Sequence, residues 1–226
     1  MIIGSGQSTG MGDILLLTSI CKHLPNCTVE LSPSAERFSR FFKGQCKEVL
    51  IKENPVDLPN IGNGHYAHAK MLGLGLGKGC YLPHIEVSKE ELERGEDLVR
   101  GYKNPMVFKS GCSTTWKRVR EASEGFWEPA IKKLGETHTI LHFGVSDNFT
   151  EFSGVVNIID SSIPDLICYY AAIKQYLGVD TGDAHLMLAC GGNTKVYSPL
   201  STPDYRRNRW RYNSQRCEYF DLAPII

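Results

Sequence analysis

The sequence predicts an α/β protein with a parallel, doubly wound sheet in each of two halves. Short apolar segments that fit buried strands alternate with segments of helical spacing, an order typical of parallel sheets covered by helices. The 226 residues also exceed the usual length of one domain, about 100 to 150 residues. Because Gly101–Pro105 is rich in turn-forming residues, we predict domains at residues 1–104 and 105–226.

The first half begins with one mononucleotide-binding βαβ unit, in which a glycine-rich loop joins a strand to a helix. Strands are expected at residues 1–3, 28–31 and 47–51, and helices at residues 14–24, 33–42, 65–72 and 88–100. The last of these helices follows the capping box Ser88-Lys-Glu-Glu91. It is so highly charged that we expect a solvated connector.

The second half repeats the alternation around a longer series of strands. Strands are expected at residues 106–109, 138–143, 155–159 and 194–198, helices at residues 124–134 and 166–172, and a strand-turn-helix unit at residues 175–190. In the first of these helices Trp127 and Ile131 are one turn apart and should face the core. Ser162 is expected to cap the second helix, and the strand at residues 194–198 to close the sheet.

The glycine-rich loop of the first half suits close approach by a ligand. Gly4 and Gly6 are followed by Gly10 one position too late for the Gly-x-Gly-x-x-Gly dinucleotide fingerprint, although Glu30 is suitably spaced for a ribose ligand. Asp13 falls in the first helical turn, where the helix dipole favours an ionised carboxylate that could act as a general base. The alternative is an ordinary first-turn acid that stabilises its helix.

The segment Gln175–Cys190 combines a strand, a tight turn at Thr181-Gly182 and the start of a helix. The first backbone N–H groups of such a helix have no internal partner, so they form a ready anion site for which a nucleotide diphosphate is the natural ligand. Asp180 would end the strand, and His185 would lie in the first helical turn near a bound phosphate. Alternatively, Asp180 and Thr181 only cap the helix and His185 is a surface histidine.

Two other polar segments each allow two interpretations. The loop after residue 109 places Lys117, Arg118 and Arg120 behind small polar residues, which suits phosphate oxygens or a solvated edge. His65 and His68 share one side of a predicted helix and could bind an acceptor or a metal, or have only a packing role.

The segment at residues 205–216 interleaves five arginines with aromatic residues. It could meet acceptor phosphates, a membrane surface or nucleic acid, or it could pack its aromatic rings on the first domain and leave the arginines in water. The 25 basic and 25 acidic residues balance, which argues against a protein that coats a polyanion.

The whole chain carries no signal-peptide pattern and no apolar stretch of membrane-spanning length, so a soluble, cytoplasmic protein is expected. Eight scattered cysteines without a Cys-x-x-Cys pair indicate reduced thiols rather than disulfides or a zinc site.

Two widely separated segments resemble one family of enzymes. Gly10-Met-Gly12-Asp13-Ile-Leu-Leu-Leu-Thr-Ser19 resembles the opening segment of family 9 glycosyltransferases, the group that contains the lipopolysaccharide heptosyltransferases. Gly178-Val-Asp180-Thr-Gly-Asp-Ala-His185-Leu resembles their Asp-Thr-Gly-x-x-His-Leu signature. Lys109-Ser-Gly111 with Lys117-Arg118, followed by Trp127, resembles the glycine loop and the Lys-x-Trp region that open their donor-binding domain.

This resemblance implies a GT-B fold, in which two Rossmann-like domains face each other, here with a shortened N-terminal domain. It implies that Asp13 is the catalytic base of a single inverting displacement. The other residues that it assigns to substrate binding are Gly10, Gly12, Gly111, Lys117, Arg118, Asp180, Thr181, Gly182 and His185. Asp183 departs from the family pattern because it adds a negative charge beside the proposed anion site.

The implied donor is a nucleotide-diphosphate sugar carrying heptose or a similar sugar, and the implied acceptor is a glycan or glycolipid, by default lipopolysaccharide core. Neither a metal nor another cofactor is expected, nor nucleic acid as a partner, whereas the arginine-rich segment could allow peripheral membrane contact. Other hypotheses are an NAD-dependent Rossmann enzyme, which would use Glu30, and a non-catalytic sugar-nucleotide binder. A metallophosphoesterase could use Asp180, Asp183 and His185, but its ordered motifs are missing.

Overall fold

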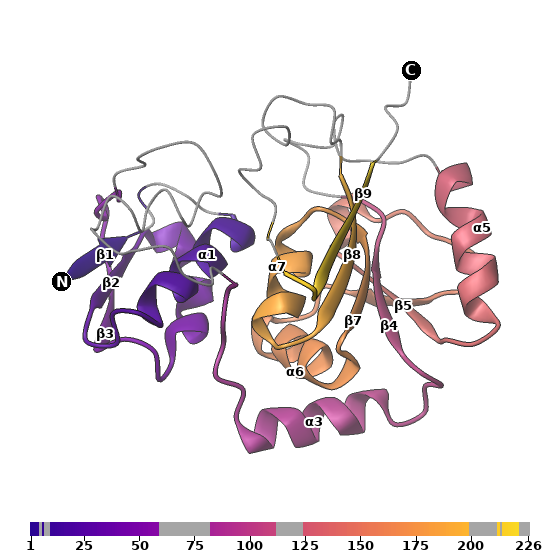
Figure 1. Cartoon of the computed structure of the whole chain (residues 1–226), viewed down its shortest axis with the longest axis horizontal. Coiled ribbons are helices and arrows are strands. Elements are labelled where there is room, and N and C mark those ends of the chain that lie inside the picture. Colours follow the sequence, from indigo (N-terminus) through magenta and orange to yellow (C-terminus); the bar gives the residue numbers. More distant parts are fainter. Residues whose placement is uncertain are drawn as a thin grey trace. The chain divides into compact units, whose positions relative to one another are not determined.

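The computed structural model describes residues 1–4, 6, 10–58, 82–111, 124–198, 212 and 214–221. Its contacts divide the chain into two compact units (Figure 1). The first consists of Met1–Glu86 with Thr202–Ser214, and the second of Val87–Ser201 with Gln215–Ile226. Each unit contains a wholly parallel sheet, so the predicted α/β class with two Rossmann-like parts is confirmed.

The first unit has a sheet of three strands in the order β1-β2-β3 among its described residues. Its elements are β1 (Ile2–Gly4), α1 (Met11–Cys21), β2 (Thr28–Leu31), η1 (Pro33–Phe42) and β3 (Glu48–Ile51). Helix α1 begins and ends three residues earlier than expected. It stops at Cys21 because Pro25 disfavours helical geometry in the residue before it, and the amides of His23 and Leu24 close tight turns instead.

Segment η1 has the predicted bounds but is wound as a 3₁₀-helix rather than an α-helix. Phe38 and Phe41 are three residues apart, the repeat of a 3₁₀ turn, and their rings stack with centroids 5.5 Å apart. Both rings are buried, so their packing accounts for the tighter winding.

The second unit has six parallel strands in the order β6-β5-β4-β7-β8-β9. Its strands are β4 (Met106–Lys109), β5 (Ile140–Gly144), β6 (Val156–Ile159), β7 (Gln175–Val179), β8 (Asn193–Ser198) and β9 (Cys217–Asp221). Its helical segments are α3 (Lys89–Val99), α5 (Glu124–Gly135), η3 (Ser146–Asn148), α6 (Ile163–Ile173) and α7 (Gly182–Ala189). The chain starts in the middle at β4, moves outward to β6, and returns to β7 before moving outward on the other side (Figure 1).

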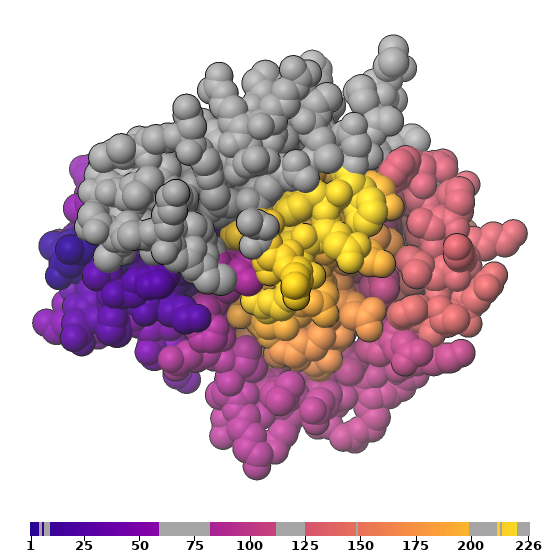
Figure 2. Space-filling view, in the orientation of Figure 1, coloured from indigo at the N-terminus to yellow at the C-terminus, as the bar shows by residue number. Residues whose placement is uncertain are grey.

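Strand β9 corrects the prediction that residues 194–198 close the sheet. It pairs in parallel with β8, in register from Thr194 with Cys217 to Ser198 with Asp221. The space-filling view shows this strand at the surface of the unit (Figure 2). The sequence concealed it because it directly follows the arginine-rich segment and has no clear apolar alternation.

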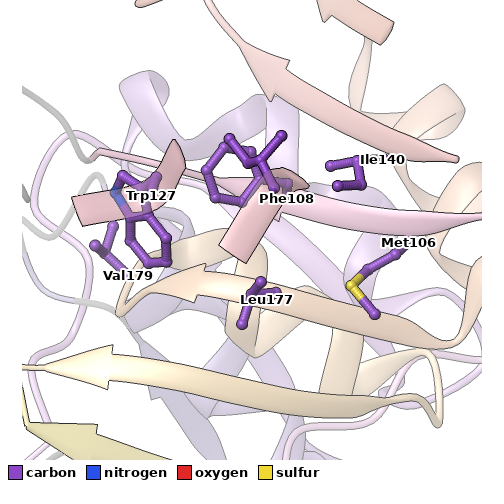
Figure 3. Packing of buried hydrophobic residues seen from close by; sticks show 7 residues of the cluster. Met106, Phe108, Trp127, Ile140, Leu177 and Val179 are labelled. Carbon is purple, nitrogen blue, oxygen red and sulfur yellow. The ribbon is translucent and has the colours of Figure 1, made fainter. Parts of the chain in front are cut away.

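One hydrophobic cluster of the second unit lies between α5 and the middle strands (Figure 3). Trp127 and Ile131 are buried on the inner face of α5, which confirms the prediction from their spacing. The ring of Trp127 packs edge-on against Phe108 of β4, with centroids 5.2 Å apart. Val179 and Leu177 of β7 complete the same cluster, so the helix fixes the two central strands.

Helix α3 has the predicted capping box but is not a solvated connector. The Ser88 hydroxyl accepts from the Glu91 amide, and the Glu91 carboxylate accepts from the Ser88 amide. The helix packs tightly on α6 at Gly95, where a Cβ atom would lie 2.1 Å from the carbonyl oxygen of Cys168. The absence of a side chain at Gly95 therefore lets α3, which precedes the predicted boundary at residue 104, join the second unit.

Candidate functional site

The order of strands reverses between β4 and β7 in the second unit. In open α/β sheets such a switch point leaves a crevice at the carboxyl ends of the strands, where ligands bind. Lys109 ends β4 and is followed by Ser110 and Gly111, while Asp180 and Thr181 follow the end of β7. The structure thus brings the predicted residues Gly111 and Asp180 to the same switch point from different parts of the chain.

A glycine keeps the two central strands close at this point. Gly178 is paired with Lys109, and a Cβ atom on Gly178 would lie 2.3 Å from the Lys109 carbonyl oxygen. Backbone atoms cannot move aside cheaply, so a side chain at this position would push β7 away from β4.

The amino end of α7 presents unpaired backbone donors directly after β7. The Ala184 and His185 amides donate to the Thr181 carbonyl oxygen at 3.1 and 3.5 Å. The Gly182 and Asp183 amides have no partner among the residues that the structure describes. Two free N–H groups at the positive end of a helix are suited to an anion, and the anion site at this turn stays a prediction.

Thr181 is the N-cap residue of α7, as the capping alternative expects, but its side chain makes no capping bond. Its hydroxyl lies 3.2 Å from the Tyr176 hydroxyl and donates to Asp183 Oδ2 at 3.4 Å. His185 is not a surface histidine, since only 7% of it is exposed. Its Nε2 lies 3.7 Å from Asp180 Oδ1, so the two predicted site residues contact each other.

Asp183 is held by Tyr170, which no sequence pattern indicated, and lies near Lys109. Its Oδ1 accepts from the Tyr170 hydroxyl of α6 at 2.6 Å, and its Oδ2 lies 3.9 Å from Lys109 Nζ. Burial raises the pKa of Tyr170 well above its usual value, and the Asp183 charge raises it further. Tyr170 therefore stays protonated and donates to the carboxylate.

A neutral histidine lies beside the same switch point. His142 of β5 is 2% exposed, and its Nε2 lies 3.0 Å from Ser110 Oγ. Burial, with a smaller contribution from the nearby Lys109 charge, lowers the pKa of His142 to about 4. The ring is therefore uncharged at neutral pH. The only sequence signal for it was a polar residue within an apolar strand pattern.

In the first unit, Asp13 lies in the first turn of α1, directly after the glycine loop. This is the position that the family resemblance implies for it. Gly10 is the N-cap residue, and its carbonyl oxygen accepts from the Ile14 amide at 3.1 Å. A Cβ atom on Gly10 would lie 3.2 Å from Asp13 Oδ2, so the carboxylate lies close over the N-cap. Gly12 is the second residue of the helix.

Glu30, which the NAD-dependent alternative uses as a ribose ligand, has a structural partner. It is buried at the end of β2, and its Oε2 accepts from the Val56 amide at 3.0 Å. Val56 also lies against Gly4, whose added Cβ atom would be 2.1 Å from the Val56 carbonyl oxygen. The carboxylate thus anchors a neighbouring segment.

Several predicted residues lie outside the described part of the chain. These are Lys117, Arg118, Arg120, His65, His68 and most of the arginine-rich segment. Among the described residues no cluster of three or more histidine, cysteine or acidic residues suits a metal ion, and no helix is long and apolar enough to span a membrane. The described cysteines are free thiols.

Comparison with known proteins defines the fold. No family model and no curated protein matches the chain. The structure is similar to E. coli ADP-heptose lipopolysaccharide heptosyltransferase II, with a TM-score of 0.67 and 14% identity over 98% of this chain and 90% of that one. A family 9 glycosyltransferase from Veillonella parvula DSM 2008 gives a TM-score of 0.73 and 11% identity over 98% and 85%.

E. coli heptosyltransferase WaaC with ADP-2-deoxy-2-fluoro heptose gives a TM-score of 0.64 and 14% identity over 97% and 92% of the two chains. These similarities cover nearly the whole chain at low identity. The fold is therefore that of the GT-B-type heptosyltransferases, which confirms the fold implied by the two sequence segments.

Proposed function

We propose that this protein is an inverting glycosyltransferase that acts without a metal ion. It moves a heptose or similar sugar from a nucleotide-diphosphate donor to a hydroxyl group of a glycan or glycolipid acceptor. The observation that carries the proposal is the pair of unpaired amides at Gly182 and Asp183, placed at the switch point of a Rossmann-like sheet. The heptosyltransferase fold supports the choice of donor class, and WaaC has been captured with an ADP-heptose analogue.

In the proposed reaction, Asp13 accepts the proton of the acceptor hydroxyl while its oxygen bonds to the anomeric carbon of the donor. The bond between that carbon and the diphosphate oxygen breaks on the opposite face, and the electron pair leaves with the diphosphate. The amides of α7 stabilise the developing charge, together with His185 and Lys117. Because the amides of α7 and Lys117 supply positive charge, the proposed reaction needs no divalent cation.

The remaining predicted residues have binding roles in this proposal. Gly10 and Gly12 allow close approach near Asp13, and Gly111 does so after β4. Arg118 adds a second cation to the phosphate site, and Asp180 orients His185 through their 3.7 Å contact. Peripheral membrane contact through the arginine-rich segment stays a prediction.

The test is release of ADP from ADP-heptose in the presence and absence of a lipopolysaccharide-core acceptor. We expect release that depends on the acceptor, persists in EDTA and gives a product of inverted anomeric configuration by NMR. A panel with UDP-, GDP- and CDP-sugars covers other donors. Donor binding without turnover on any acceptor offered would instead favour a non-catalytic sugar-nucleotide binder, and a product of retained configuration would contradict the mechanism.

A further inference from the structure

Lys109 is a cation at the end of β4 whose ammonium group is only partly engaged. Its Nζ donates to the Phe143 carbonyl oxygen at 3.0 Å and lies 3.9 Å from Asp183 Oδ2, which is beyond hydrogen-bond distance. An ammonium group carries three donors, so two of them are unused within the described structure. The Lys109 side chain as a whole is 18% exposed, so it is mostly buried.

Asp183 is a negative charge fixed close to this ammonium group. Its two oxygens are bonded by Tyr170 and Thr181, at 2.6 and 3.4 Å. Its side chain is 12% exposed. A carboxylate bonded on both oxygens cannot swing away when another anion arrives, so it opposes anion binding at the same place.

The same residue also provides an attractive group. The backbone amide of Asp183 is one of the two unpaired donors at the amino end of α7. An anion bound to that amide therefore lies near Lys109, which attracts it, and near the Asp183 carboxylate, which repels it. His142 beside them is neutral at working pH and does not change this balance.

We infer that Lys109 is a phosphate ligand of the donor and that Asp183 is its fixed counter-charge, which limits how tightly the nucleoside diphosphate product is held. The inference rests on the proposed function and gives a role to Lys109, which the resemblance matches only as part of a loop, and to Asp183, which departs from the family pattern. A fully uncompensated cation would bind the product diphosphate tightly and delay its release. The pair keeps the directional bond from Lys109 while lowering the net charge of the site.

The inference predicts opposite effects for the two halves of the pair. Binding of ADP, UDP, GDP, CDP and inorganic pyrophosphate is measured by calorimetry on the full chain. For the diphosphates that bind, Lys109→Met should weaken binding about tenfold, the usual effect of losing a charge-assisted hydrogen bond. Asp183→Asn should tighten binding several-fold, because asparagine can still accept from Tyr170 while the repulsion is removed.

Matched variants separate charge from folding. Lys132→Met removes an exposed lysine of α5 and should leave binding unchanged. Lys109→Arg keeps the charge and should retain most of the affinity. The affinity for the parent nucleosides, which lack phosphate, should be the same in all of these variants. Melting curves identify any variant that does not fold, and in that case Lys109→Gln replaces Lys109→Met.

The outcomes distinguish this inference from the proposed function. If the native protein bound none of the nucleoside diphosphates, the proposed function would fall. If it bound one of them and Lys109→Met bound it equally well, only the role of Lys109 would be overturned. Weaker binding by a folded Asp183→Asn variant would overturn the role of Asp183 as a counter-charge.

Discussion

The amino ends of α1 and α7 are a matched pair that the two units use differently. Each helix follows a parallel strand and carries an aspartate in its first turn, Asp13 in α1 and Asp183 in α7. Asp183 is buried and bonded by Tyr170 and Thr181, whereas Asp13 is half-buried and lies over its own N-cap residue. A first-turn acid can therefore be a fixed counter-charge or a candidate base, and its neighbours decide which.

The largest expected difference between the two aspartates is in the rate of sugar transfer. Asp13→Asn should lower the rate by about 10²- to 10⁴-fold, the usual effect of losing a general base, with little change in donor affinity. Asp183→Asn should lower the rate several-fold at most, through slower release of the diphosphate, since its carboxylate takes no proton in the reaction. The measurement is kcat with saturating donor.

The control is Glu36→Gln, which changes an exposed first-turn acid of η1 in the same unit as Asp13. It should keep full activity. Equal losses of activity in Asp13→Asn and Glu36→Gln would mean that Asp13 only stabilises its helix. The proposed difference between Asp13 and Asp183 would then be wrong.

The stability of the second unit should depend on pH through His142 of β5. The imidazole titrates near 6.5 in the unfolded chain and near pH 4 in the folded protein, so the unfolded state binds more protons between these values. Stability is then fully present above about pH 6.5 and decreases as the pH falls toward 4. The loss is on the order of 3 kcal/mol.

Urea denaturation of the native protein at several pH values between 4 and 7 measures this loss. His142→Phe should flatten the profile in that window, whereas His138→Gln, a change at the start of the same segment, should leave it intact. An unchanged slope in His142→Phe would assign the pH dependence to other groups.

Adding a methyl group to one glycine of each unit should have different effects on stability. Gly178→Ala should destabilise the second unit by about 1–3 kcal/mol, because the new methyl group meets the Lys109 backbone at 2.3 Å. Gly10→Ala meets only the end of the Asp13 side chain, at 3.2 Å, and should cost less. Thermal unfolding measures both, and equal shifts in Tm would show that the strand contact at Gly178 is less rigid than described.

The smallest effect expected is that of Tyr170→Phe. Removing its hydroxyl leaves Asp183 with a weaker set of donors, which should lower the free energy of unfolding by about 1–2 kcal/mol. Tyr169→Phe alters the preceding residue of α6 and should change stability by less than about 0.5 kcal/mol. Equal effects would show that the hydroxyl of Tyr170 does not anchor Asp183.

Local sequence patterns predicted most of the fold. Apolar strands and the Ser88 and Ser162 caps were placed correctly because alternation and capping depend on neighbours in sequence. The winding of η1 was not predicted, since it depends on the stacked rings of Phe38 and Phe41. The packing of α3 was not predicted either, since it depends on the contact of Gly95 with α6. Strand β9 was missed for a related reason, because pairing with β8 defines it.

The candidate site also contains residues that the sequence predicts and residues that only the fold brings together. The turn at Thr181-Gly182 was recognisable because its residues are consecutive, and so was the position of Asp13 behind the glycine loop. Lys109, Tyr170 and His142 are on three different elements, and only the folded sheet brings them to one switch point. No spacing in the sequence encodes such contacts.

The switch point of the second unit should bind a nucleoside diphosphate. The direct measurement is the Tm of the native protein with ADP, UDP, GDP, CDP or NAD added, because a ligand that binds only the folded state stabilises it by about 2.7 kcal/mol at 100 times its Kd. We predict that at least one nucleoside diphosphate raises the Tm and that NAD does not. A rise with NAD and none with any nucleoside diphosphate would contradict the account.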